Sequence, residues 1–170
     1  MPAAATARTA SSASAECSPA FGKIQRKQVG SPYKPSGTHL IQATLTLADT
    51  DVDHVGDVCD ILKFPPNCRL LALKATATDL DTHATPTLTF NIAYSATAAT
   101  AGGTALISAT DVGKAGGTAY LGTTYQGGIV DVSDKYLSFD VEVVSATPAA
   151  GTLVVEALVY LGDPATITGS

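Results

Sequence analysis

Acidic side chains are the first residues of this chain that could do chemistry. In the segment DTDVDH, residues 49–54, Asp49, Asp51 and Asp53 alternate with other residues. Carboxylate oxygens at such spacing are a donor set for calcium. The segment lacks the glycine and the bidentate glutamate of a calcium-binding helix–loop–helix. The sequence therefore predicts solvated carboxylates in a strand connection, and no metal site.

Histidines are the second group of residues that could do chemistry. His54 and His83 could join Asp53 or Asp79 around zinc, but no ligand spacing typical of zinc sites is present. The GxSxG motif of serine hydrolases is also absent. We expect neither a cofactor nor a metal ion.

Two glycine pairs are the remaining candidates for a binding site. Gly102-Gly103 and Gly116-Gly117 are each followed by threonine. A phosphate-binding loop also needs a lysine and a helix whose dipole faces the anion, and neither follows. The glycines are therefore interpreted as turn residues in loops. With no catalytic residues to assign, the protein is predicted not to be an enzyme.

Alternation of apolar and polar residues is the main structural signal. One face of residues 40–48 carries Ile41, Ala43, Leu45 and Leu47, for example. Short strands with turn signals about every ten residues predict an all-β fold, a single β-sandwich or jelly-roll-like domain with an extended N-terminal arm. The predicted strands are residues 40–48, 57–64, 69–78, 87–95, 105–108, 119–121, 128–132, 136–144 and 152–161.

Two hairpins are expected within this pattern. The first, Gly56–Leu71, turns at Pro65-Pro66, where neither residue can donate to a ladder. Cys59 and Cys68 flank that turn, so these two cysteines could form a disulfide across the hairpin. The first residues carry no signal-peptide pattern, which predicts cytosolic synthesis and reduced thiols. The second hairpin is Tyr136–Leu161, at the end of the domain.

Charge divides the chain into an arm and a domain. Residues 1–38 hold five basic residues and one acidic residue, a net charge of +4, and the remainder has a net charge of −9. The arm has too few large apolar groups to fold alone. We predict a flexible basic arm over 1–38, the β-sandwich domain over 39–163 and a tail over 164–170. An acidic domain argues against nucleic acid, and no apolar run has membrane-spanning length.

One run of the sequence has a family resemblance. VGDVCDILKFPPNCRLLALKATATDLD, residues 55–81, resembles a pattern in the capsid decoration (cement, or head-stabilising) proteins of tailed bacteriophages. A Phe-Pro-Pro-Asn turn replaces the single proline and glycine of that pattern, and the long basic arm is a second departure. The resemblance covers residues 39–162, and its matching pieces are Gly56-Asp57-Val58, Leu62, Pro66, Arg69-Leu70-Leu71, and Gly151 to Val155 through Tyr160.

The resemblance implies a structural virion protein. Such a protein binds the outer surface of the phage head, contacts the major capsid protein, bridges neighbouring capsomers and stabilises the capsid. It would be made in the host cytoplasm and would be a homotrimer, or alternatively a dimer. The low-charge segment 96–128 is predicted at a subunit or capsid contact. The residues of the arm that we expect to bind the capsid are Phe21, Lys23, Ile24, Arg26, Lys27 and Tyr33.

Two other functions remain open from the sequence. One is a head-fibre or tail-associated virion protein, which would be expected to carry a shaft-like repeat or a receptor groove. The other is a carbohydrate-binding jelly roll, which commonly stacks sugars on exposed aromatic rings. The chain has no tryptophan. Its tyrosines are predicted in the core or at an interface: Tyr94, Tyr120, Tyr125, Tyr136 and Tyr160.

Overall fold

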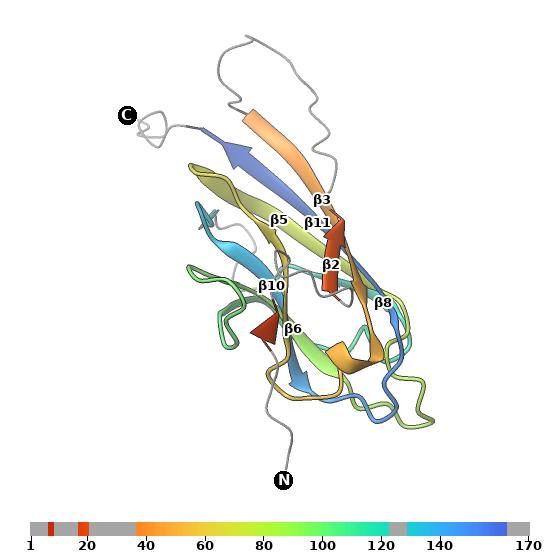
Figure 1. Cartoon of the computed structure of the whole chain (residues 1–170). Helices are drawn as coiled ribbons and strands as arrows, with labels where there is room; N and C mark the ends of the chain where they lie inside the picture. Colours follow the sequence, from red (N-terminus) through yellow and green to blue (C-terminus); the bar gives the residue numbers. More distant parts are fainter. Residues whose placement is uncertain (1–6, 9–16, 21–36, 123–128, 163–170) are drawn as a thin grey trace.

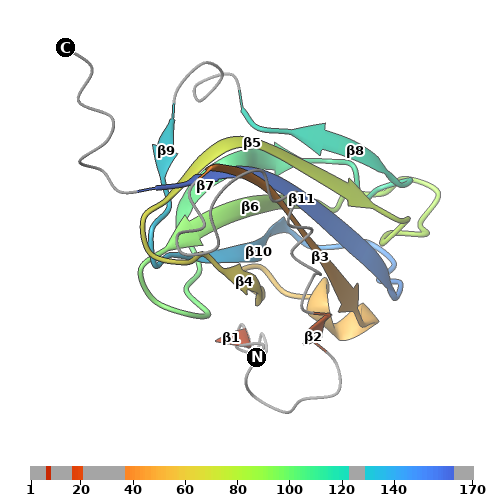
Figure 2. The same cartoon turned by 90° about the horizontal axis from the view of Figure 1, so that it is seen from above.

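Two β-sheets packed face to face make up this protein, as a computed structural model shows (Figures 1 and 2). The structure describes residues 7–8, 17–20, 37–122 and 129–162. Within those residues the one helix is a single 3-10 turn, η1 (Asp49–Asp51). The predicted all-β sandwich is confirmed.

Sheet A contains five strands in the order β1-β4-β10-β6-β7. All neighbours are antiparallel except β1 and β4, which run parallel. The strands are β1 (Ala7–Arg8), β4 (Val58–Lys63), β10 (Tyr136–Val143), β6 (Thr89–Ser95) and β7 (Thr104–Thr110).

Sheet B contains six strands, and its main order is β2-β3-β11-β5-β8, all antiparallel. A short strand, β9, pairs with one end of β5. The strands are β2 (Cys17–Ala20), β3 (Gly37–Leu47), β11 (Gly151–Leu161), β5 (Cys68–Ala77), β8 (Gly117–Tyr120) and β9 (Val130–Asp131). Two pieces of the predicted arm, β1 and β2, thus form edge strands of the two sheets (Figure 2).

The core lies between the sheets because every second residue of each long strand points inward. The rings of Phe90 in β6 and Phe139 in β10 pack with centroids 4.8 Å apart and planes tilted by 42°. Full burial of each such side chain contributes about 1.5–3 kcal/mol. The largest fully buried side chains are Phe64, Phe90, Phe139, Leu45, Leu47, Ile61, Leu70, Leu80, Leu88, Ile92, Leu106 and Leu137.

A β-bulge changes which residues of β5 face the core. Simple alternation over residues 69–78 places Leu71 inward. The register between β5 and β11 shifts between Leu158 and Val159, so that Leu158 pairs with Ala72 and Val159 with Leu70. Leu71 has no partner in that register, and Leu70 is fully buried in its place. The predicted inward position of Leu71 is therefore wrong, and the bulge is the reason.

Both predicted hairpins are wrong in their pairing. β4 belongs to sheet A and β5 to sheet B, so the Pro65-Pro66 segment is a corner at which the chain crosses between sheets. β10 and β11 are divided between the sheets in the same way. Proline ends a strand by removing an N–H donor, and it does not decide which sheet the next strand joins.

The cysteines follow the corrected topology. Cys68 is a free, buried thiol in sheet B, and Cys59 lies in sheet A. The disulfide considered between these two residues is therefore not formed. Cys59 is disulfide-bonded, so its partner is a cysteine other than Cys68. This corrects the expectation that the thiols are all reduced.

Candidate functional site

Two neighbouring sheet edges are only partly covered. β3 pairs with β11 along its whole length, but β2 covers its other side only at Thr44–Leu47. β4 pairs with β1 only at Val58–Cys59. Among the described residues, the outer edge of β3 from Gly37 to Ala43 has no strand partner. Backbone N–H and C=O groups on such an edge can pair with another chain.

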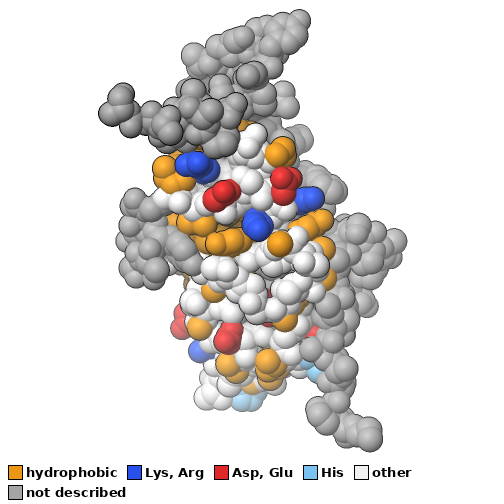
Figure 3. Space-filling view, turned by 90° about the vertical axis from the view of Figure 1, so that its left-hand side faces the viewer, with side chains coloured by type: hydrophobic (Ala, Val, Ile, Leu, Met, Phe, Trp, Pro, Cys, Tyr) orange, Lys and Arg blue, Asp and Glu red, His pale blue; other side chains and the backbone are white. Residues whose placement is uncertain are grey.

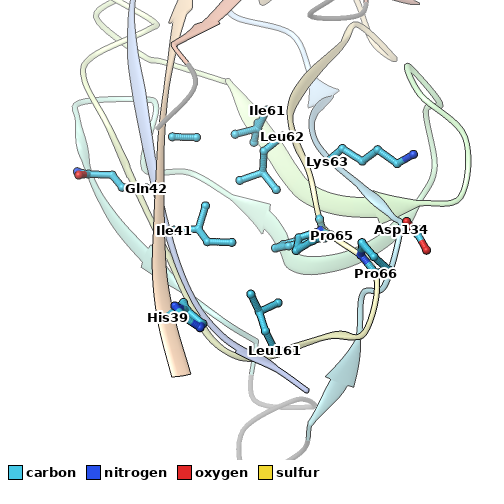
Figure 4. A pocket seen from close by; sticks show the side chains of 12 residues that line it. His39, Ile41, Gln42, Ile61, Leu62, Lys63, Pro65, Pro66, Asp134 and Leu161 are labelled. Atoms are coloured by element: carbon cyan, nitrogen blue, oxygen red, sulfur yellow. The ribbon is translucent and has the colours of Figure 1, made fainter. Parts of the chain in front are cut away.

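An apolar groove opens between these two edges. Its volume is about 400 Å³. Ile41 of β3 and Leu62 of β4 project into the gap from opposite sides, whereas Gln42 and Lys63 point away from it (Figure 4). The described residues that line the groove are His39, Ile41, Gln42, Ala43, Ile61, Leu62, Lys63, Phe64, Pro65, Pro66, Asp134 and Leu161.

His39 is the unusual member of this lining. Both ring nitrogens are buried and have no hydrogen-bond partner among the described residues. A buried polar atom without a partner costs about 1–3 kcal/mol. Lys63 also lines the groove, and its ammonium lies 5.1 Å from the centre of the Tyr136 ring, a cation–π distance. The groove is thus an apolar slot with one unsatisfied imidazole.

Two buried carboxylates hold the Gly/Ala-rich loop 96–103 on sheet A. Both oxygens of Asp60 accept the Ala99 N–H, at 3.0 and 3.1 Å, and Asp140 accepts the Gly102 N–H at 2.8 Å. Burial raises the pKa of both carboxyls, and the backbone N–H groups oppose that change. Simple alternation over residues 136–144 places Asp140 on the face opposite Leu137 and Phe139, away from the core. It is instead 5% exposed, because the loop held on this face covers it.

A third buried carboxylate, Asp81, joins two loops at the other end of the sandwich. Its oxygens accept five backbone N–H groups. Four come from Thr87 at 2.7 Å, Leu88 at 3.1 Å, Ala146 at 3.0 Å and Thr147 at 3.0 Å, and the fifth is that of His83 at 3.4 Å. Burial alone would raise the pKa of Asp81, but the four donors outweigh burial and hold that pKa well below its usual range. The sequence reading did not single out this residue.

The acidic segment before β4 forms turns. Asp51 accepts the Ala48 N–H at 2.8 Å and starts the 3-10 turn, and Asp49 is exposed and accepts the Thr50 N–H. Asp49, Asp51 and Asp53 were considered as calcium ligands. Their carboxylates do not form one metal-ligand cluster among the described residues.

One candidate metal-ligand group does appear in the part of the chain that the structure describes. Asp53, His54 and Asp57 have ligand atoms within 4.8 Å of one another. The His54 Nδ1 lies 2.6 Å from an Asp53 oxygen, and Asp57 accepts the His54 backbone N–H at 3.2 Å. These contacts close a tight turn. His83, the other histidine considered for zinc, instead bonds Thr85 within its own loop.

The outer surface carries few charges. On the face seen in Figure 3, uncharged and apolar groups cover most of the described surface, and charged side chains are scattered among them in both its upper and its lower part. On sheet B, Leu40 and Leu158 sit opposite one another and are 44% and 36% exposed. Lys74 and Glu156 form an ion pair at 2.7 Å on the same sheet. Tyr120 is 65% exposed and is therefore not part of the core, so its position at an interface stays a prediction.

The predicted capsid-binding residues of the arm lie outside the described residues. They are Phe21, Lys23, Ile24, Arg26, Lys27 and Tyr33. The groove and the open β3 edge were not found from the sequence. The one available signal was the corner Pro65-Pro66, whose residues line the groove. No described helix has the length and apolar character needed to cross a membrane.

Comparison with solved structures finds the same fold in two bacteriophage capsids. A chain of the Cyanophage Pam1 capsid asymmetric unit superposes with a TM-score of 0.61 at 21% identity, covering 82% of this chain and 95% of that chain. A chain of the capsid of Ralstonia phage GP4 superposes with a TM-score of 0.64 at 19% identity, covering 81% and 92%. This chain shares their sandwich fold. No family model and no curated protein sequence matches it.

Proposed function

We propose that this chain is a structural protein of a tailed-bacteriophage virion that binds the outer surface of the head and joins neighbouring capsomers. The observation that carries the proposal is the fold match, which extends over 95% and 92% of two chains from phage capsids. The motif resemblance in residues 55–81 and 151–160 supports the same function from the sequence alone.

The construction of the domain suits a clamp. A shell under internal DNA pressure must be held across the joints between subunits, and a rigid body transmits that load. Here the chain crosses repeatedly between the sheets. Asp60, Asp81 and Asp140 use their buried carboxylates to fix backbone loops. These groups serve local structure, which supports a structural role over catalysis.

We further propose that the arm binds the capsid and that the protein is a homotrimer. Exposed ion pairs made by Lys23, Arg26 and Lys27 contribute only about 0–1 kcal/mol each. The apolar anchors Phe21 and Ile24, with Tyr33, contribute about 1.5–3 kcal/mol each when fully buried. A carbohydrate-binding role has less support, because Tyr120 is the one strongly exposed aromatic side chain among the described residues.

Co-sedimentation with phage heads that lack the protein tests this function. We expect saturable binding of the full-length chain at a fixed number of copies per head, and heads that retain DNA at higher temperature once decorated. Deletion of residues 1–38 should weaken binding while far-UV circular dichroism still shows a folded β protein. Absence of binding by the folded full-length protein would refute the proposal.

A further inference from the structure

We propose that residues 21–27 of the chain's own arm occupy the groove by continuing β2 along the open edge of β3. Phe21 then fills the apolar slot, and Gln25 bonds the buried imidazole of His39. This placement applies to the protein free of heads, and it does not depend on the proposed function. Binding of Phe21 to a capsid requires the arm to leave the groove.

The register of β2 on β3 decides which arm residues would face the groove. Cys17 lies opposite Leu47, and Ala20 lies opposite Thr44. Residues directly opposite one another in an antiparallel pair project to the same face of the sheet. Continued by sequence, this register sets three arm residues against three residues of the groove lining: Phe21 opposite Ala43, Lys23 opposite Ile41 and Gln25 opposite His39. The arm therefore reaches the groove without any change of register.

The path of the chain favours the arm over a separate molecule. β2 ends at Ala20, opposite Thr44, whereas β3 begins at Gly37, about 23 Å farther along the edge at about 3.3 Å per residue. The 16 residues between these strands cover that distance in any case. With residues 21–27 paired, nine remain for the return into β3, fewer than the about 12 beyond which structureless connections are uncommon. Covalent attachment also gives the arm a high effective concentration at the groove.

Phe21 and Gln25 match the chemistry of the groove lining. The groove has a volume of about 400 Å³, and the residue opposite Phe21 is the small Ala43, which leaves room for an aromatic ring. Both ring nitrogens of His39 are buried without a partner among the described residues, which is costly in an apolar setting. A glutamine amide both donates and accepts hydrogen bonds, so Gln25 satisfies the imidazole in either tautomer.

Lys23 and Ile24 are also accommodated in this register. The aliphatic stem of a lysine packs along apolar surface while its ammonium stays at a polar rim. Ile41 offers such surface opposite Lys23, and Asp134 supplies a carboxylate on the same lining. On the other face of the sheet, Ile24 falls opposite Leu40, which is 44% exposed. The pairing therefore also covers an apolar side chain that is open to water.

Engineered disulfides test the register in the full-length protein. With Ile24→Cys and Leu40→Cys, the two Cα atoms lie about 4.5–5.5 Å apart, a separation that a disulfide spans. Oxidised glutathione takes up two electrons and two protons from the thiols as the S–S bond forms, and it leaves as two reduced thiols. The control pairs Ile24→Cys with Thr44→Cys, on the same face but roughly 13 Å farther along β3.

We expect the first pair to form an intramolecular disulfide, identified by peptide mass spectrometry, and the control pair to stay largely reduced. The native cysteines are the same in both variants, so their reactions cancel in the comparison. Equal yields for the two pairs, or a disulfide that joins two copies of the protein, would overturn the proposal.

Amide hydrogen exchange provides a second test, with Phe21→Asp and Tyr33→Asp as matched variants. Each replaces an aromatic ring of the arm by a charge, but position 33 lies outside the segment placed in the groove. The amides of residues 37–43 that do not bond to β11 should exchange at least about tenfold faster in Phe21→Asp than in wild type, since one buried aromatic contact is worth that much. Tyr33→Asp should match wild type.

Equal exchange rates at this edge in Phe21→Asp and wild type would contradict the placement of the arm. Both experiments use the protein without heads. Failure of the wild-type protein to sediment with heads would therefore remove the proposed function and leave the placement of the arm intact.

Discussion

Replacing Asp81 by alanine should strongly destabilise the fold. The carboxylate is 1% exposed and accepts N–H groups from Thr87, Leu88, Ala146 and Thr147. Each buried donor left without an acceptor costs about 1–3 kcal/mol, and such costs are not additive because water enters the opened site. We expect the free energy of unfolding to fall by about 3–5 kcal/mol, as when one partner of a buried charged pair is removed.

Urea titration at pH 7, followed by circular dichroism, measures this change. Asp49→Ala is the matched control, because the Asp49 side chain is exposed and accepts the N–H of the neighbouring Thr50. That variant should stay within about 0.5 kcal/mol of wild type. A loss at Asp81 no larger than at Asp49 would refute the assigned role of the four hydrogen bonds.

The same carboxylate predicts a pH dependence with a definite sign. Because folding lowers the pKa of Asp81, its contribution to stability is present above the unfolded pKa of about 3.9 and declines as pH falls toward the folded pKa. Below about pH 4, the stability difference between wild type and Asp81→Asn should shrink by up to about 1.4 kcal/mol per pH unit. A difference that stays constant from pH 7 to pH 2.5 contradicts this reasoning.

Three further measurements test other parts of the structure. Burial raises the pKa of Asp140, so the protonated carboxyl favours folding and this contribution to stability is lost as pH rises. Urea titration at pH 7 should therefore give Asp140→Asn a free energy of unfolding equal to or above that of the wild type. Burial, with the nearby charge of Asp131, raises the pKa of Cys68 to about 12, so the thiol stays protonated and unreactive in the folded protein at pH 8. Mass spectrometry should find the Cys68 peptide alkylated by iodoacetamide only when the protein is unfolded in urea. Gly151→Ala would press its Cβ against the Thr78 hydroxyl and should lower the unfolding free energy by about 1–3 kcal/mol. An unchanged melting temperature would contradict that contact.

The sequence was sufficient to locate the long strands of residues 37–161 because each has one apolar face. Leu45 and Leu47 in β3, and Leu137 and Phe139 in β10, alternate with polar neighbours and are all fully buried. Alternation depends only on the local pleat, so it could be read without knowing the partner strands. It failed at Leu71, where a bulge in the β5–β11 pairing shifts the phase.

The strands with which each strand pairs could not be predicted from the sequence in the same way. Strands that follow one another in the chain often pair, and that expectation made β4 and β5 a hairpin. The inner faces of both sheets are apolar, so neither the pattern nor Pro65-Pro66 states which sheet receives the next strand. The groove between β3 and β4 depends on this assignment and was invisible for the same reason.

The buried carboxylates could not be recognised from the sequence for a related reason. Nothing in the sequence indicated that Asp60, Asp81 and Asp140 are buried, since aspartate is seldom fully buried. Burial becomes favourable only when backbone N–H groups from distant loops converge on each carboxylate, as Ala99 and Gly102 do. Those loops are separated from their aspartates by 38 or 39 positions, which no local pattern reports.

The position of β11 has a consequence for protein synthesis. This strand is the last among the described residues, yet it lies between β3 and β5 in sheet B and pairs with both. β3 and β5 therefore emerge from the ribosome without the strand that must separate them. β5 ends at Ala77 and β11 at Leu161, so at about 5–20 residues per second β11 is completed roughly 4–17 s after β5. Throughout that time two apolar strands wait with open edges, so nascent chains on neighbouring ribosomes are at risk of aggregation, and a chaperone that shields those edges should raise the yield of native protein.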